Sequence, residues 1–448
     1  MRSIETFIAL NRFGLGVGPH DARRVGGDPR RWLLAQIDSR QRTPARLERF
    51  PDSASIVKDI FEARRSGSEA LRKTTRKHYR RNFGAELVAR ARHAITTDTP
   101  FAERLVLFWS NHFTVSRTKA IIGPALPAYE REAVRPHVFG RFEDMLLAAV
   151  GHVAMLAYLD NDRSMGPNSR AGRRAKRSLN ENLAREILEL HTLGVDGGYR
   201  QNDVTEFAKA LTGWTHGGMV GRRSRRTISG KFQFRAAMHE PGSKRVLGRT
   251  YPEAGEEEAR RIMRDLVRHP STARFIATKL VRHFVADDPP PGDVARIARV
   301  FSDSSGDLAS VSRALVELPS VWEAPLAKVK TPYELVISTL RAVDHGKAGF
   351  RVLRVPLQTM GHEPFNAPSP QGWPDRAEHW IAPQALLRRV EWLRAVAAKA
   401  RVEQSPSAFL ESLAGPAASA PTRRMVALAP SADAGVALVL ASAEFQRR

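Results

Sequence analysis

The sequence of 448 residues contains no cysteine, which excludes disulfides, zinc-thiolate sites, iron-sulfur clusters and thiol nucleophiles. Any metal ion would have to be held by histidine, aspartate or glutamate. Long apolar runs are also absent, since no window approaches the ~18 uninterrupted apolar residues that a membrane-spanning helix needs. Glu5 and Arg12 interrupt what would be the apolar region of a signal peptide. We therefore expect a cytoplasmic protein without a membrane span.

Several motifs that identify nucleotide-dependent enzymes and hydrolases are missing. The sequence has no GxGxxG after a strand, no Walker-type phosphate loop, no GxSxG and no HExxH. The glycines of residues 13–18, FGLGVG, follow a helix-like stretch and therefore predict a turn. These absences argue against a nucleotide-dependent enzyme and against an α/β-hydrolase.

Acidic residues are few relative to basic ones. Lys and Arg number 71 against 47 Asp and Glu, which gives a formal net charge of +24. Such an excess attracts polyanions such as nucleic acid or an acidic surface. The alternative is that arginines coat the solvated faces of ordinary helices, and the even spread of charge along the chain favours this interpretation.

Alternating strand patterns are scarce, and most of the chain has the apolar period of amphipathic helices. The fold class predicted is mostly α, a large multi-helix domain over residues 1–448 with a small β-hairpin insertion at 226–251. In the insertion, strand residues around Phe232 and Phe234 precede a turn and resume at Val246 and Leu247. We expect a flexible basic loop at 163–177 and an Ala/Ser/Pro-rich linker at 403–421 before the last helix.

A long basic helix is predicted from Ser68 to about Ala94. Its cations recur at i, i+4 spacing and could bind phosphates together with the basic loops at 163–177 and 222–226, although such a stripe is more often a solvated face. The stripe consists of Arg72, Lys73, Arg76, Lys77, Arg80 and Arg81.

Residues 180–191, NENLAREILELH, combine the pattern of a core-packed helix with an unusual number of polar groups. A helical period places Asn182, Glu186 and Glu189 on one face between apolar sides, where polar groups must be paired or must face a cavity. Glu186 and Glu189 could bind a cation or move protons. Arg185 could instead pair with Glu181 and Glu189 at i, i+4 spacing, which would make the stripe purely structural.

Two further histidines are candidates for the same site. His112 and Asn111 lie between aromatic residues in FWSNHF, and together they supply hydrogen-bond donors and acceptors at one point. His239 lies in a turn with Lys244, which suits recognition of an anion. A histidine on an apolar face is nonetheless more often a satisfied core residue than a ligand.

Linked segments of the chain resemble the bacterial domain-of-unknown-function 1800 family over nearly the whole length. They are LNRFGLG, ERLVLFWSNHF, LDND, residues 180–214, FQFRAAMHEPGSKRVLG, HPSTARFIATKLVRHFV, KTPYELV and PSPQGWP. The resemblance implies one large helical domain without an established activity, genes that often neighbour a secreted sulfatase-like family, and many exported members. It implies that the family's polar positions fall on Asn111, His112, Asn180, Glu181, Asn182, Arg185, Glu186, Glu189, Trp214, His239, Lys244 and His269. His191 departs from the family, in which an aromatic residue is usual.

Three functions follow as hypotheses. The first is a metal-binding or acid-base enzyme with a central polar pocket for a small molecule or anionic ligand. Its catalytic or metal-binding residues, with a divalent metal as cofactor, would be Glu186, Glu189, His112 and His239; its ligand-binding residues would be Asn111, Asn182, Arg185, Trp214 and Lys244. The second is a polyanion-binding module for nucleic acid or an acidic surface. The third is a scaffold for a protein encoded by a neighbouring gene.

Overall fold

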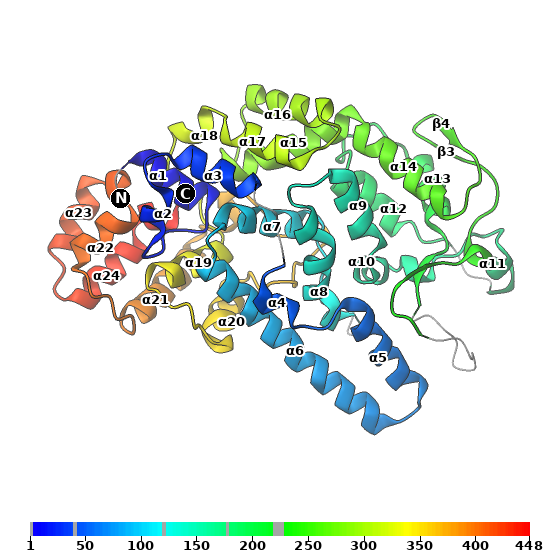
Figure 1. Cartoon of the computed structure of the whole chain (residues 1–448), viewed down its shortest axis with the longest axis horizontal. Coiled ribbons are helices and arrows are strands. Elements are labelled where there is room, and N and C mark those ends of the chain that lie inside the picture. Colours follow the sequence, from blue (N-terminus) through cyan, green and yellow to red (C-terminus); the bar gives the residue numbers. More distant parts are fainter. Residues whose placement is uncertain (1–2, 39–42, 119–121, 176–178, 218–227) are drawn as a thin grey trace.

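The structure is a computed structural model that describes residues 3–38, 43–118, 122–175, 179–217 and 228–448. Nearly all of its regular elements are helices, which confirms the predicted mostly α fold with a small β-hairpin insertion. The molecule is elongated in Figure 1, with α22 to α24 at one end and the short strands β3 and β4 at the other. Helices α5 and α6 project from the body as an arm (Figure 1).

The elements follow one another in a chain of mostly short helices. From the N-terminal side they are α1 (Ile4–Ile8), η1 (Ala9–Phe13), α2 (Asp21–Val25), α3 (Pro29–Asp38), α4 (Ala45–Glu48), α5 (Ser53–Arg65), α6 (Glu69–Thr96), α7 (Pro100–His112), η2 (Gly123–Ala125), α8 (Leu126–Tyr129), η3 (Glu130–Val134), η4 (Arg135–His137), α9 (Phe142–Gly151), α10 (Val153–Tyr158), η5 (Asn161–Arg163), α11 (Arg170–Ala175), α12 (Asn182–Glu186), η6 (Ile187–His191), α13 (Gln201–Leu211), β1 (Trp214–His216), β2 (Phe232–Phe234) and η7 (Ala236–Met238). They continue with β3 (Lys244–Val246), β4 (Arg249–Tyr251), α14 (Glu256–Arg268), α15 (Pro270–Phe284), α16 (Pro291–Asp303), α17 (Leu308–Val316), α18 (Ser320–Glu323), α19 (Pro332–Ala342), α20 (Phe350–Thr359), η8 (Ala377–His379), α21 (Pro383–Ala397), α22 (Pro406–Leu413), η9 (Gly415–Ala417), α23 (Ala420–Ala427), α24 (Ala432–Ala441) and α25 (Ala443–Gln446).

Helix α7 lies at the centre of the hydrophobic core. It begins at Pro100, whose fixed φ angle suits the first turn of a helix. The ring of Phe101 packs edge-on against Phe13 at a centroid distance of 5.4 Å, and Trp109 is 1% exposed. The apolar sides of α7 thus hold it in the core, and its last turn carries Asn111 and His112 to a cavity described below.

The strands form two separate two-stranded antiparallel sheets, in which β1 pairs with β2 and β3 pairs with β4. The prediction that the strand around Phe232 pairs with the one around Val246 is therefore wrong. Leu247 and Gly248 both have positive φ, 49° and 78°, which closes a tight two-residue turn between β3 and β4. This turn joins Val246 to Arg249 and leaves β2 to pair with the earlier strand β1.

Several predicted segments can be located in the fold. The basic helix is α6, which begins after Ser68, whose hydroxyl accepts a hydrogen bond from the amide of Leu71 at 3.2 Å. Helix α11 lies within the predicted basic loop 163–177, and α22 lies within the predicted linker 403–421. Residues 176–177 of that loop, the predicted basic loop at 222–226 and the first two residues of the predicted insertion lie outside the described residues.

In the described ranges, no helix combines the length and apolar character that crossing a membrane requires.

Candidate functional site

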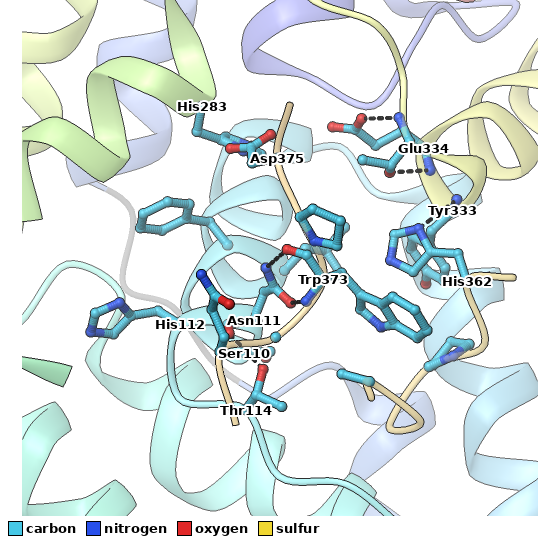
Figure 2. A pocket seen from close by; sticks show the side chains of 18 of the residues that line it. Ser110, Asn111, His112, Thr114, His283, Tyr333, Glu334, His362, Trp373 and Asp375 are labelled. Atoms are coloured by element: carbon cyan, nitrogen blue, oxygen red, sulfur yellow. Dashed lines mark hydrogen bonds and ion pairs between the residues drawn. The ribbon is translucent and has the colours of Figure 1, made fainter. Parts of the chain in front are cut away.

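A cavity of about 470 Å³ opens among four segments that are distant in the sequence, and Arg90 of α6 adds to its lining. Its walls come from the last turns of α7, the last turns of α15, the start of α19 and the irregular segment 362–379. Figure 2 shows side chains from all four segments turned toward this space. The volume suits a small organic molecule.

Asn111 fixes one wall of the cavity. Its amide nitrogen donates to the carbonyl of Trp373 at 2.9 Å, and its amide oxygen accepts from the backbone N–H of Trp373 at 2.7 Å (Figure 2). The adjoining Gly372 has φ +84°, and a Cβ there would lie 2.5 Å from the carbonyl oxygen of Asn111. Glycine therefore allows the two backbones to approach closely enough for the amide of Asn111 to bind both groups.

Glu334 is the anionic centre beneath the cavity. It lies at the third position of α19, and its carboxylate accepts from the backbone N–H of Thr331 at 2.7 Å in a capping box. The same carboxylate forms ion pairs with the buried guanidinium groups of Arg104 and Arg448. These cations hold the pKa of Glu334 well below its usual range despite burial, which by itself would raise it.

His283 and Asp375 form a hydrogen-bonded pair at the cavity wall. Nδ1 of His283 lies 2.8 Å from Oδ2 of Asp375, and the two residues lie side by side in Figure 2. Burial lowers the pKa of His283, although Asp375 opposes this shift. His283 is therefore neutral at pH 7, with Nδ1–H donated to Asp375 and with Nε2 accepting a long hydrogen bond of 3.5 Å from the guanidinium of Arg104.

Lys279 and Arg282 bring positive charge to the same wall. Lys279 precedes His283 by four residues on α15, so the two side chains lie on one face of the helix. Across the part of the chain that the structure describes, neither Lys279 nor Arg282 pairs with a carboxylate, and Arg282 donates only to the carbonyl of Asp287 at 3.2 Å. Burial lowers the pKa of Lys279 to about 8, with a smaller contribution from the charge of Arg282, although the carboxylate of Asp375 opposes the shift.

Cations outnumber carboxylates around the cavity. Both lining carboxylates, Glu334 and Asp375, already contact cations. The lining cations are Arg90, Arg104, Lys279, Arg282 and Arg376. Arg90 pairs with Glu130 and Arg376 with Asp288, both outside the lining, and Arg104 pairs with Glu334, so Lys279 and Arg282 are the lining cations without a carboxylate partner in the described residues. An anionic ligand would offset this excess, because it would lower the repulsion among the cations.

Two of the residues predicted from the sequence line this cavity, Asn111 and His112. His112 is buried, its Nε2 lies 3.1 Å from the carbonyl of His191, and burial holds its pKa well below the ordinary value. Among the described residues, Nδ1 of His112 has no hydrogen-bond partner. His112 is thus a neutral imidazole at the edge of the cavity.

The predicted carboxylate stripe lies outside the cavity lining. Arg185 contacts both Glu181 at 3.3 Å and Glu189 at 3.5 Å, as the structural interpretation expected. Glu186 is half-buried, and burial together with Glu189 raises its pKa to about 7. Asn182 is exposed at the start of α12. The helix continues as the π-helical η6, so the faces of Glu189 and His191 do not follow a regular 3.6-residue period.

His239 and Lys244 belong to a separate buried cluster. Nε2 of His239 lies 2.6 Å from Oε2 of Glu258, and the ammonium of Lys244 lies 3.1 Å from the other oxygen of that carboxylate. His239 also contacts the carbonyl of Thr212 at 2.9 Å. Trp214 is fully buried, with Arg260 over its ring at 5.3 Å. The contacts of His239 and Lys244 tie strand β3 to helix α14.

The four predicted metal ligands, Glu186, Glu189, His112 and His239, do not form one group. No cluster of three or more histidine, aspartate or glutamate side chains suited to a metal ion occurs among the described residues. Assignment of a metal site to these four residues stays a prediction.

Sequence reasoning gave no role to His283, Asp375, Lys279, Arg282 or Glu334. Each lies in or beside a segment that carries the family resemblance: residues 269–285, KTPYELV and PSPQGWP. The signal that could have found them was the i, i+4 spacing of Lys279 and His283 on one helix. Nothing in the sequence indicated that Asp375, 92 residues later, completes the pair.

Comparison with known proteins gives one match. A family model described as "Protein of unknown function (DUF1800)" matches residues 8–447, which is nearly the whole chain. No curated protein and no solved structure matches this chain.

Proposed function

We propose that this chain, which belongs to the DUF1800 family of proteins of unknown function, is an acid-base enzyme that acts on a small anionic molecule. The substrate binds in the cavity between α7, α15, α19 and residues 362–379. The observation that carries the proposal is the His283–Asp375 pair, which lies one helical turn from the unpaired ammonium of Lys279.

His283 is the proton-transfer group in this proposal. Asp375 holds the imidazole in the tautomer that leaves Nε2 unprotonated, as carboxylates do for catalytic histidines. Asp375 is ionised, because His283, Lys328 and Arg448 hold its pKa far below the usual value despite burial, which by itself would raise it. A substrate proton that takes the place of the long contact between Arg104 and Nε2 therefore meets a neutral base of fixed orientation.

Lys279 and Arg282 supply the attraction for the anion. They are three residues apart on α15, and no carboxylate of the described residues forms an ion pair with either of them. A carboxylate or phosphate between them would gain charge-assisted hydrogen bonds, worth about 1.5–3 kcal/mol each.

We expect Lys279→Gln to weaken the binding of lactate and of inorganic phosphate by about tenfold, which corresponds to ~1.4 kcal/mol. Wild-type affinity for lactate, whose charge is constant over this range, should fall as pH rises through about 8, because Lys279 then loses its proton and its charge. Isothermal titration calorimetry at pH 6.5 and pH 9 measures both effects.

The matched control is Lys399→Gln, which removes an exposed lysine that does not line the cavity. Its affinity should equal that of the wild type. Equal binding by Lys279→Gln and wild type would show that the anion does not use this wall. Absence of binding to the wild type would remove the anionic substrate from the proposal.

The arm formed by α5 and α6 favours a second function, which is the binding of a polyanion such as nucleic acid. All six cations of the predicted stripe, from Arg72 to Arg81, are exposed. Across the described residues none of the six pairs with a carboxylate. Burial, followed by the charges of Arg163 and Arg72, lowers the pKa of Arg64 on α5.

Removal of four of these cations should reduce the salt dependence of DNA binding. For a protein that neutralises Z phosphates, the slope of log K against log salt concentration is about −0.9Z. In a variant with Lys73, Arg76, Lys77 and Arg80 changed to Gln, this negative slope should therefore be smaller in magnitude by roughly 3–4. Fluorescence anisotropy with a labelled DNA duplex, recorded at salt concentrations from about 50 to about 200 mM, measures this slope. An unchanged slope, or no binding at low salt, would contradict this function.

A further inference from the structure

We propose that Lys279 forms an imine with the carbonyl group of a small 2-oxo acid bound in the cavity. This inference rests on the proposed function, because it names the class of substrate that the same site accepts. It also assigns a covalent role to a side chain that the acid-base proposal uses only as a positive charge.

The position of Lys279 suits a nucleophile. Its side chain is half-buried in the wall of the cavity, with its ammonium 5.6 Å from the centroid of the Phe275 ring. No hydrogen bond or ion pair holds this nitrogen in the described residues. Most other lining cations are committed, as Arg90 is to Glu130 and Arg104 to Glu334.

Arg282 gives the reason for choosing a 2-oxo acid. In such a molecule the carboxylate is bonded directly to the carbonyl carbon. A carboxylate held by the guanidinium of Arg282 therefore leaves its carbonyl close to Lys279, three residues earlier on the same helix. The planar guanidinium can hold a carboxylate through two parallel hydrogen bonds while the amine of Lys279 reacts.

The reaction balances without an external oxidant or reductant. The lone pair of the neutral amine forms the N–C bond as the π bond of the carbonyl group breaks, and one proton passes from the nitrogen to the carbonyl oxygen to give a carbinolamine. Loss of the hydroxyl group as water, with proton transfer through Nε2 of His283, then gives the imine. The carbonyl carbon keeps its oxidation state, and hydrolysis reverses each step.

The chemistry needs an amine that is neutral near physiological pH. Burial and the charge of Arg282 lower the pKa of Lys279 to about 8, whereas Asp375 opposes the shift. At pH 8 about half of the Lys279 side chains carry a neutral amine, against roughly one in 250 for a lysine with the ordinary pKa of about 10.4.

The test is reductive trapping on the full chain at pH 8. Wild-type protein is mixed with pyruvate or 2-oxoglutarate and then with cyanoborohydride, which reduces an imine to a stable secondary amine. Peptide mapping by mass spectrometry locates the modified lysine. Lys279→Arg keeps the charge and removes the amine nucleophile, and Lys399→Arg makes the same change at an exposed lysine outside the cavity lining. Lactate and 2-hydroxyglutarate, which lack the carbonyl, serve as matched ligands.

We expect Lys279 to be labelled roughly 10–100-fold faster than exposed lysines, because more of its amine is neutral. The labelling should disappear in Lys279→Arg, remain in Lys399→Arg, be slowed by lactate, and reach a plateau above about pH 8. Uniform labelling of surface lysines, or none at Lys279, would overturn the inference.

Calorimetry separates failure of this inference from failure of the proposed function. If lactate and pyruvate bind with similar affinity and pyruvate is not trapped, the imine is wrong and the anion site stands. If neither acid binds and neither is trapped, both proposals fail.

Discussion

Replacement of Glu334 by alanine should lower the free energy of unfolding by about 3–5 kcal/mol, because it leaves buried cations without their partner. Arg104 and Arg448 are almost fully buried, and both form ion pairs with Glu334. Urea denaturation followed by circular dichroism measures the change. The loss should be among the largest of any single substitution, since buried ion pairs are costly to break from one side.

Glu317→Ala is the matched control, because Glu317 is exposed near the end of another helix and should change stability by less than about 0.5 kcal/mol. Glu334→Gln keeps the shape and some hydrogen bonds, so its loss should lie between the two. A loss below about 1 kcal/mol for Glu334→Ala would show that water or rearrangement compensates both cations, contrary to the role given to this carboxylate.

Replacement of His283 by asparagine should slow an exchange reaction of pyruvate by about 10²–10⁴-fold, the usual contribution of a general base. An imine at Lys279 makes the methyl protons of pyruvate acidic, and Nε2 of His283 would remove one of them. Proton NMR in D₂O follows the loss of the methyl signal. The wild-type rate should fall as the pH drops below about 8, because protonation of Lys279 removes the amine that forms the imine, whereas the lowered pKa of His283 leaves the imidazole neutral at pH 7.

His345→Asn is the control for this exchange, since His345 is exposed and does not line the cavity. Its rate should match that of the wild type. Unchanged exchange in His283→Asn would remove the histidine from proton transfer, even if Lys279 is trapped as expected. Asp375→Asn should slow the reaction as well, because it releases the imidazole from its fixed tautomer.

The predicted helices agree with the structure where local signals were strong. Ser68 caps α6, and Thr331 with Glu334 forms a capping box at α19, both of which follow from short-range chemistry. The strand pairing was wrong because it depends on which distant strand is nearer in space. The Leu247–Gly248 turn, with positive φ at both residues, joins β3 to β4 and so fixes their pairing. Leu247 gave no signal of this turn, because only glycine favours positive φ angles.

The site was harder to predict than the fold. Asn111 and His112 were identified because they stand out as polar residues between aromatic ones. The pair His283–Asp375 and the ion pair Arg104–Glu334 join residues 92 and 230 positions apart, and a single sequence carries no record of such contacts. The polar stripe around Glu186 was a reasonable candidate, because polar groups between apolar helix faces must be paired or must face a cavity. In the structure Arg185 forms ion pairs with two residues of this stripe, Glu181 and Glu189.

The central claim is that the wall of α15 with Lys279, Arg282 and His283 recognises an anionic substrate. A crystal structure of the protein soaked with lactate tests it most directly. The account predicts that the lactate carboxylate lies between Lys279 and Arg282, and that the carbon next to the carboxylate faces Nε2 of His283. A carboxylate bound elsewhere in the cavity, or a cavity that holds only water at saturating lactate, would contradict it.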